Sequence, residues 1–165
     1  MLVDMTTRRK HCVRRIVSGG QSGVDRGALD AAISMGIEHG GWCPRGRLAE
    51  DGRIPPRYRL VETKTALYRA RTEQNVIDSD GTLILFRATL RGGTELTRRL
   101  AVQHGKPHLL VDLAQPLDVS VIRQWLLTAA IEVLNVAGPR ESSSPGIADE
   151  CQQLIREIFV ERRRR

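Results

Sequence analysis

Residues 16–26 set the architecture of this chain, and they read Ile16-Val17-Ser18-Gly19-Gly20-Gln21-Ser22-Gly23-Val24-Asp25-Arg26. A short β-branched run from Val13 to Ser18 leads into a glycine-rich turn, and a helical pattern begins directly after that turn. Apolar residues then recur on one face, and Gly36 ends the predicted helix. The chain therefore opens with a strand, a glycine turn and a helix.

The same alternation continues along the rest of the chain. Strands are predicted at 60–63, 81–86, 108–113 and 133–137, and helices at 66–79, from 91–93 to 105–107, at 120–131 and from 147 onward. Residues 39–46 hold a strand too short to assign and a glycine-rich turn. Residues 47–59 read as a loop, because Pro55-Pro56 blocks a helix. Strands that alternate with helices are typical of an α/β fold with a mainly parallel sheet and helices on both faces.

Three glycine turns follow strands of this predicted sheet: 19–23, 92–93 and the turn near Gly138. Right-handed crossovers bring every strand-to-helix turn to the carboxyl edge of a parallel sheet. We therefore expect the three turns to converge there and to form the ligand site.

Length and composition favour one soluble domain. The chain has 165 residues, of which 41% are hydrophobic. No apolar run approaches the ~20 residues that span a bilayer, and no apolar segment follows the basic cluster near the N-terminus. The three cysteines are odd in number and lack C-x-x-C spacing, which argues against a disulfide framework and structural zinc. We expect a cytoplasmic protein without a metal site or membrane association.

The net charge of +7 comes from the two ends of the chain. Nine of the 26 basic residues lie there, whereas residues 16–161 carry 17 basic and 18 acidic groups. We predict basic tails at 1–12 and 162–165 around a single ligand-binding domain at 13–161. Aromatic residues make up only 4%, which leaves no obvious stacking platform, so a nucleic-acid partner is not expected.

The first turn has the residues of an anion site. Backbone N–H groups of Gly19 to Gly23 and the start of the following helix can approach a phosphate, and Ser22 adds a hydroxyl donor. Gln21 lies within the same turn. The spacing matches neither the dinucleotide fingerprint nor the P-loop. Phosphate binding and a plain tight turn both remain open.

Asp25 and Arg26 follow the turn, and each has two interpretations. Ser22 and Asp25 have the spacing of a capping box, in which Asp25 would only stabilise the helix start. Alternatively, the carboxylate contacts a metal, hydroxyl or amine of the ligand. Arg26 either points toward the ligand or is a solvated helix residue.

The second turn offers another cradle for an anion, formed by Gly92, Gly93, Thr94 and Thr97. Thr94 could equally be a helix N-cap. Arg87 and Arg91 flank this turn and either neutralise an anionic ligand or are ordinary loop arginines.

Two other segments carry polar groups. Cys43 and Arg45 lie near the expected mouth of the site, where a thiolate could meet a soft metal, although a lone cysteine more often packs in a core. Arg140 follows the third turn and is its best candidate for ligand binding. No nucleophile–base arrangement or useful carboxylate pair is present, so the sequence favours a binder over an enzyme.

The chain resembles the molybdenum cofactor carrier family over about residues 13–160. The resemblance rests on separate blocks in the same order: residues 16–32, His39-Gly40-Gly41-Trp42-Cys43-Pro44, Ala49-Glu50-Asp51-Gly52, residues 71–76, residues 78–84, Gly92-Gly93-Thr94, His104-Gly105-Lys106-Pro107 and residues 134–142. This family is in turn similar to a superfamily that includes the Lonely-guy-type phosphoribohydrolases, once called lysine decarboxylases, and the DNA-processing protein A.

The resemblance implies a Rossmann-like three-layer fold and homo-oligomers, either dimers or tetramers. It also implies that the ligand is the molybdenum cofactor, a phosphorylated molybdopterin. A carrier would shelter this oxygen-labile compound between the enzymes of its synthesis and the molybdoenzymes that use it. The phosphate would lie on the amides of Gly20 to Gly23 and of Gly92 to Thr94, with Arg26, Arg87 and Arg140 balancing its charge.

The alternative is a nucleotide-binding protein or a nucleoside-monophosphate phosphoribohydrolase, with Glu95 or Asp25 as the catalytic carboxylate. The phosphoribohydrolases have the pattern G-G-x-G-T-x-x-E, and Thr97 stands here where that glutamate belongs. A hydroxyl cannot do the work of a carboxylate at an oxocarbenium-like centre. The resemblance to the carriers is therefore the stronger one.

Overall fold

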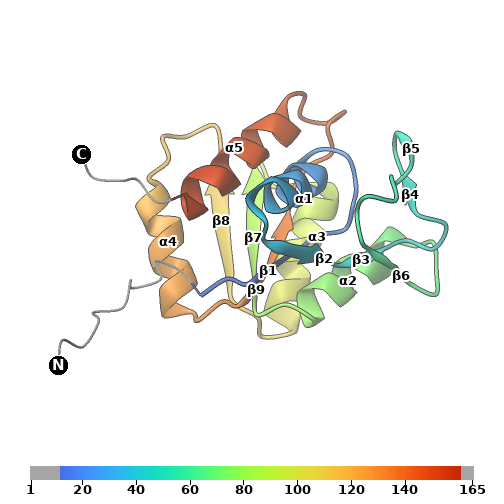
Figure 1. The fold of residues 1–165 in the computed structure, drawn as a ribbon, viewed down its shortest axis with the longest axis horizontal. Coiled ribbons are helices and arrows are strands. Elements are labelled where there is room, and N and C mark those ends of the chain that lie inside the picture. The colour runs from blue at the N-terminus through green and yellow to red at the C-terminus, as the bar shows by residue number, and fades with distance from the viewer. Residues whose placement is uncertain (1–11, 161–165) are drawn as a thin grey trace.

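A computed structural model describes residues 12–160 of the chain. The predicted tails at 1–12 and 162–165 lie, apart from Cys12, outside the described residues. The ribbon in Figure 1 shows a central sheet between two layers of helices, with a smaller arm at one end.

The central sheet has five parallel strands in the order β2-β1-β9-β7-β8. They are β1 (Arg15–Val17), β2 (Glu38–Gly40), β7 (Gly81–Phe86), β8 (His108–Asp112) and β9 (Val133–Ala137). The last strand, β9, lies in the middle and pairs with β1 and β7. The predicted parallel sheet is confirmed. From β1 the chain continues to β2 at one edge of the sheet, and from β7 it continues to β8 at the other edge. The carboxyl ends of β1 and β7 therefore lie on the two sides of a topological switch point.

Helices cover both faces of this sheet (Figure 1). The helices α1 (Val24–Met35), α4 (Val119–Thr128) and α5 (Ile147–Phe159) share a large core with the sheet, whereas α2 (Tyr68–Ile77) and α3 (Gly92–Gln103) pack together on the other side. The three-layer α/β prediction is therefore confirmed. Along residues 12–160, none of the helices combines the length and apolar character needed to cross a membrane.

Local signals explain where these helices begin and end. Gly36 takes the left-handed conformation, with φ of 67°, and caps the carbonyls at the end of α1 as its position predicts. Asp118 accepts a hydrogen bond from the Ser120 N–H at 2.9 Å and starts α4. In α5, Ile147, Cys151 and Ile155 recur at helical spacing and are fully buried.

Residues 41–65 form the arm, which differs in part from the sequence prediction. Within it β3 (Trp42–Cys43) pairs with β6 (Val61–Glu62), and β4 (Leu48–Ala49) pairs with β5 (Gly52–Arg53) in a hairpin. The hairpin lies in the segment predicted as a loop, because the two prolines that block a helix follow the hairpin and do not interrupt it. The guanidinium of Arg47 donates to the carbonyls of Ile54, Pro55 and Tyr58 and holds the arm together.

The packing of α1 against α5 depends on Gly27. A Cβ at this position would lie 2.3 Å from the carbonyl oxygen of Ala148 on α5. Alanine favours a helix by ~1 kcal/mol over glycine, but overpacking against backbone costs ~1–3 kcal/mol. We therefore expect Gly27→Ala to lower the free energy of unfolding by up to ~2 kcal/mol, measured by urea denaturation.

A matched control for this variant is Gly93→Ala, since a Cβ at Gly93 meets no atom within 4 Å. This variant should be at least as stable as the wild type. Equal stability of both variants would contradict the close contact between α1 and α5.

Candidate functional site

A cavity of about 410 Å³ opens at the carboxyl edge of the sheet. Its lining comes from the three glycine turns and from α2: Gly19, Gln21, Asp25, Tyr68, Arg71, Thr72, Asn75, Thr89, Arg91, Gly92, Gly93, Thr94, Leu96, Thr97, Asn135, Ala137, Gly138, Pro139, Arg140 and Ser143. The predicted convergence of the three turns is confirmed. The volume falls in the range of small-molecule sites.

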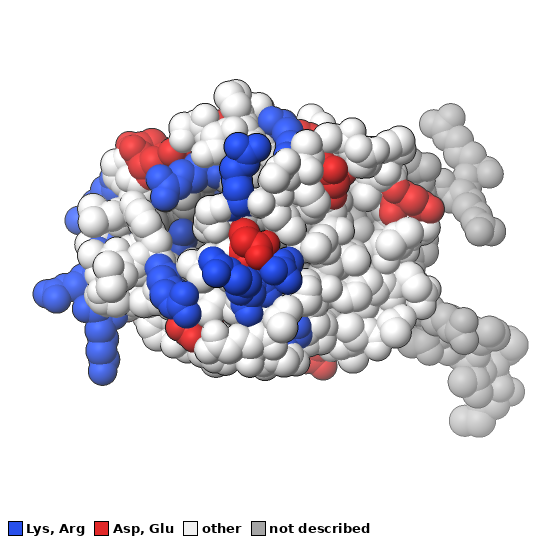
Figure 2. Space-filling view, turned by 180° about the vertical axis from the view of Figure 1, so that it is seen from behind, with Lys and Arg blue, Asp and Glu red and all other residues white. Residues whose placement is uncertain are grey.

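Positive charge dominates this cavity. Arg71, Arg91 and Arg140 line it, and Asp25 is the sole acid among the described lining residues. Figure 2 shows that basic side chains gather around a hollow on the face opposite to that of Figure 1. The lining therefore suits an anionic ligand better than a cationic one.

Side-chain oxygens bind two backbone donors of the first turn, the N–H groups of Gln21 and Ser22. The Asp25 carboxylate accepts from the Gln21 N–H at 3.1 Å, and the Gln21 side-chain oxygen accepts from the Ser22 N–H at 3.0 Å. The Ser22 hydroxyl hydrogen-bonds to Glu50, and Gly23 is the N-cap of α1. The capping-box interpretation of Ser22 and Asp25 is therefore wrong, because the Ser22 side chain caps no helical N–H. An anion at Gln21 or Ser22 would meet N–H groups that the protein already uses.

Asp25 forms a buried ion pair with Arg71 from α2, at 3.3 Å. The residue is 7% exposed, and burial raises the pKa of its carboxyl, while Arg71, the Gln21 N–H, the Ser18 hydroxyl and the Gly19 N–H oppose this rise. The same guanidinium donates to the carbonyl of Gly19 at 3.0 Å. Arg71 thus ties α2 to both ends of the first turn.

The second turn is open toward the cavity. Arg91 is the N-cap of α3 in an extended conformation, without a side-chain cap, and Thr94 lies inside the helix. The alternative that Thr94 is the N-cap is therefore wrong. The N–H groups of Gly92, Gly93 and Thr94 have no partner within α3, since a helix leaves its first donors unpaired. A Cβ at Gly92 or Gly93 would meet no atom within 4 Å, which leaves space for a ligand atom beside these donors.

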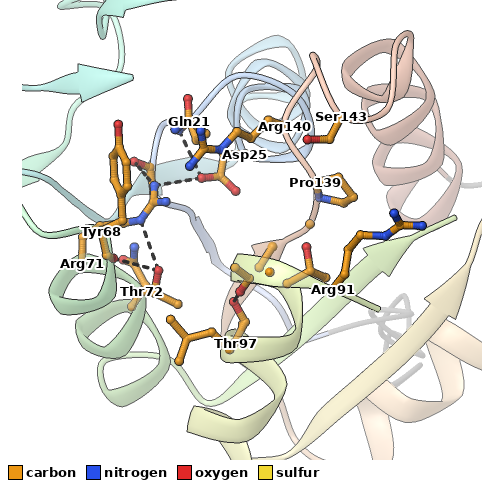
Figure 3. Close-up of a pocket in the computed structure, with 18 of the residues that line it drawn as sticks. Gln21, Asp25, Tyr68, Arg71, Thr72, Arg91, Thr97, Pro139, Arg140 and Ser143 are labelled. Carbon is orange, nitrogen blue, oxygen red and sulfur yellow. Dashed lines mark hydrogen bonds and ion pairs between the residues drawn. The ribbon is translucent and has the colours of Figure 1, made fainter. Parts of the chain in front are cut away.

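The third turn brings Arg140 into the cavity. Its guanidinium lies over the ring of Tyr68, 5.3 Å from the centroid, and the guanidinium of Arg71 lies 5.4 Å from the same centroid. Figure 3 shows Arg140 reaching across the cavity toward Gln21 and Asp25, whereas Arg91 and Thr97 lie on the other side.

Other predicted ligand residues lie outside the lining. Arg26 pairs with Asp51 and donates to the carbonyl of Gly20, and Arg87 pairs with Glu150 at 2.6 Å. Glu95, the alternative catalytic residue, pairs with Arg98 and is not part of the lining. The residues that the structure places away from the cavity wall are Gly20, Ser22, Gly23, Arg26, Arg45, Arg87 and Glu95.

Cys43 belongs to the core of the arm. It is fully buried and packs in a cluster with Leu29, Ile54 and Tyr58. Burial raises the pKa of its thiol, so the sulfur stays protonated at neutral pH. The packing interpretation of Cys43 therefore holds. Within residues 12–160 no group of three or more His, Cys, Asp or Glu side chains could hold a metal ion.

Sequence reasoning missed the wall that α2 contributes. Tyr68, Arg71, Thr72 and Asn75 all line the cavity, at the spacing of one helical face. Asn75 also binds the N–H and the carbonyl of Trp42, at 2.8 and 2.9 Å, which fixes α2 against the arm. The signal in the sequence was a polar stripe in a helix with few apolar residues, and the structure buries Asn75 at its end.

The fold and the cavity together define a Rossmann-like α/β protein with a ligand-sized cavity at the carboxyl edge of its sheet. The chain belongs to the circularly permutated YpsA SLOG family, whose model matches residues 16–159. It is similar to the crystal structure of a Putative molybdenum carrier protein from Syntrophus aciditrophicus SB, with 45% identity and a TM-score of 0.87 over 92% of this chain and 97% of that one. A comparison with curated proteins finds no match. The family resemblance identified from the sequence blocks is confirmed.

The ion pair of Asp25 and Arg71 yields a prediction about pH. A carboxyl with a raised pKa binds its proton more tightly in the folded state, so its contribution to stability falls as pH rises from about 4 through the folded-state pKa. Removing Arg71 takes away a charge that lowers this pKa. We expect Arg71→Ala to lose ~3 kcal/mol of unfolding free energy near pH 7.5 and clearly less near pH 4.5, measured by urea denaturation.

The control is Arg14→Ala, which breaks a surface pair with Glu132 whose side chains are both 61% exposed. This variant should lose less than ~1 kcal/mol at either pH. If Arg71→Ala loses the same amount at both pH values, Arg71 does not control the ionisation of Asp25.

Proposed function

We propose that the protein is a cytoplasmic carrier of the molybdenum cofactor, which it holds by the phosphate of the molybdopterin. One observation carries the proposal: the uncapped N-terminus of α3 opens into a cavity rich in arginine. Family membership and the name of the Syntrophus aciditrophicus protein support the choice of ligand. The cargo would pass between cofactor-synthesis enzymes and molybdoenzymes. The carrier would be a homo-oligomer, either a dimer or a tetramer.

In this proposal the phosphate lies on the N–H groups of Gly92, Gly93 and Thr94. The partial positive charge of a helix N-terminus favours an anion there, and the missing side chains at both glycines let the anion approach. Arg91 and Arg140 provide formal positive charge, and neither makes an ion pair among the described residues. The first turn contributes the side chains of Gln21 and Asp25, because the N–H groups of Gln21 and Ser22 are already engaged.

The test introduces a negative charge into the cradle. Gly93→Asp places a carboxylate beside the donors that would hold the phosphate, in a position with open space and ordinary backbone geometry. We expect the affinity for molybdopterin to fall at least ~10-fold, measured by anaerobic calorimetry. The difference in affinity between molybdopterin and its dephosphorylated form should also disappear in this variant.

Arg99→Ala is the matched control, because Arg99 is an exposed residue of α3 outside the lining. It should bind molybdopterin like the wild type. If Gly93→Asp retains the preference for the phosphorylated form, the phosphate does not lie at α3.

A further inference from the structure

The connection from β7 to α3, residues 87–91, contains a residue in a strained backbone conformation. Ala88 has a φ of 60°, a positive value that favours glycine over residues with a Cβ. Two other non-glycine residues in the described part of the chain, Arg47 and Ala130, have positive φ, but neither is next to a lining residue. Ala88 is, because Thr89 lines the cavity. Strain of this kind persists only where the surroundings hold it, and beside a cavity it suggests a role in the site.

Ala88 is the centre of a three-residue turn. The N–H of Thr89 donates to the carbonyl of Arg87 at 2.7 Å, across Ala88. A γ-turn with positive φ at its centre is the rare and strained form of this turn. The direction of the chain after the turn sets the positions of Thr89 and Arg91, which both line the cavity (Figure 3).

Asp112, the last residue of β8, holds this turn from the neighbouring strand. β7 pairs with β8 so that Phe86 lies opposite Asp112, and the Asp112 side chain reaches beyond this last pair. Its oxygen Oδ1 accepts from the Ala88 N–H at 2.8 Å and from the Ala114 N–H at 2.9 Å. One carboxylate oxygen therefore ties the strained residue to the loop after β8.

Arg87 anchors the first residue of the same turn. Its guanidinium donates to the carbonyl of Pro145 at 3.0 Å and pairs with Glu150 of α5 at 2.6 Å. Both partners follow the third glycine turn in the chain, so Arg87 connects the segment before α3 to the segment after Gly138. Because this end of the turn is held, the bond to Asp112 acts on the conformation of Ala88 itself.

The hydrogen bond to Asp112 is large enough to offset the strain. A positive φ is disfavoured for alanine by a factor of roughly 5–30. A hydrogen bond to a charged acceptor changes an equilibrium by a comparable factor. Without this acceptor, the observed turn would be populated in a minority of molecules. The apparent dissociation constant of a ligand that needs the turn rises in inverse proportion to that population.

We propose that Asp112 is a positioning residue of the ligand site. It holds Ala88 in the strained turn, and the turn fixes the wall that runs from Thr89 to the start of α3. The effect on ligand affinity rests on the proposed function, which places the phosphate at α3, whereas the held turn is a property of the free protein.

The experiment combines a removal with a rescue, and neither substitution changes a lining residue. Asp112→Ala removes the acceptor, so the Kd for molybdopterin, measured by anaerobic calorimetry, should rise ~5–30-fold. Ala88→Gly removes the penalty on positive φ. The double variant Asp112→Ala/Ala88→Gly should therefore bind molybdopterin within ~2-fold of the wild type.

The free protein gives a second readout that does not depend on the ligand. The N–H of Thr89 is protected from hydrogen exchange while the γ-turn is formed. Its exchange rate, measured by NMR, should increase at least ~5-fold in Asp112→Ala and return toward the wild-type rate in the double variant.

Two control variants separate positioning from general stability. Asp118→Ala removes a carboxylate that also accepts a backbone N–H, that of Ser120 at 2.9 Å, but lies outside the lining. This variant should be less stable and should bind molybdopterin like the wild type. Asp112→Ala/Ala130→Gly places glycine at another alanine with positive φ, and it should not restore the affinity.

The outcomes separate this proposal from the proposed function. Wild-type affinity in Asp112→Ala, or a loss that Ala88→Gly does not reverse, would overturn the positioning role. Restoration by Ala130→Gly would overturn it as well, because Asp112 would then act only through global stability. If the wild type binds no molybdopterin while the Thr89 exchange rates follow the expected order, the proposed function fails and the held turn stands.

Discussion

The ion pair between Asp25 and Arg71 is the contact on which the cavity depends. It joins the start of α1 to α2, and Arg71 also binds the carbonyl of Gly19. Because both charges are buried, each one needs the other, and the loss of either partner would leave an unpaired charge in a poorly hydrated place. The position of the α2 wall is therefore coupled to the conformation of the first glycine turn.

This pair also decides which turn can hold an anion. A glycine turn before a helix is a ready anion site, yet here the Asp25 carboxylate already accepts from the Gln21 N–H in the middle of that turn. The protein thus supplies its own anion at the first turn and leaves the second turn open. Two turns that look alike as sequence therefore have different chemistry, and the difference comes from one carboxylate two residues into α1.

The fold could be predicted because its signals are local and repeated. Alternation of apolar strands and helices predicted the parallel sheet, and crossover handedness predicted that turns 19–23, 92–93 and 138 meet. The assignment of arginines could not be predicted in the same way. Arg26 and Arg87 look suited to an anion, but Asp51 and Glu150, distant in sequence, pair with them. The α2 wall was missed because Tyr68 and Arg71 belong to no glycine motif.

The two carboxylates that could act as a general base are each engaged by an arginine. Thr97 replaces the glutamate of the phosphoribohydrolase pattern, and its hydroxyl donates back to the carbonyl of Gly93 at 2.9 Å. Glu95 is held by Arg98 outside the cavity, and the pKa of its carboxyl is lowered by that hydrogen bond, which weakens it as a proton acceptor. Asp25 lines the cavity, but Arg71 already engages its charge. A general acid or base must reach the bond that breaks, whereas a carrier needs only to hold its cargo at both ends. In the proposed carrier, the open N-terminus of α3 would hold the anion, and the paired carboxylate of Asp25 would lie at another part of the cavity wall.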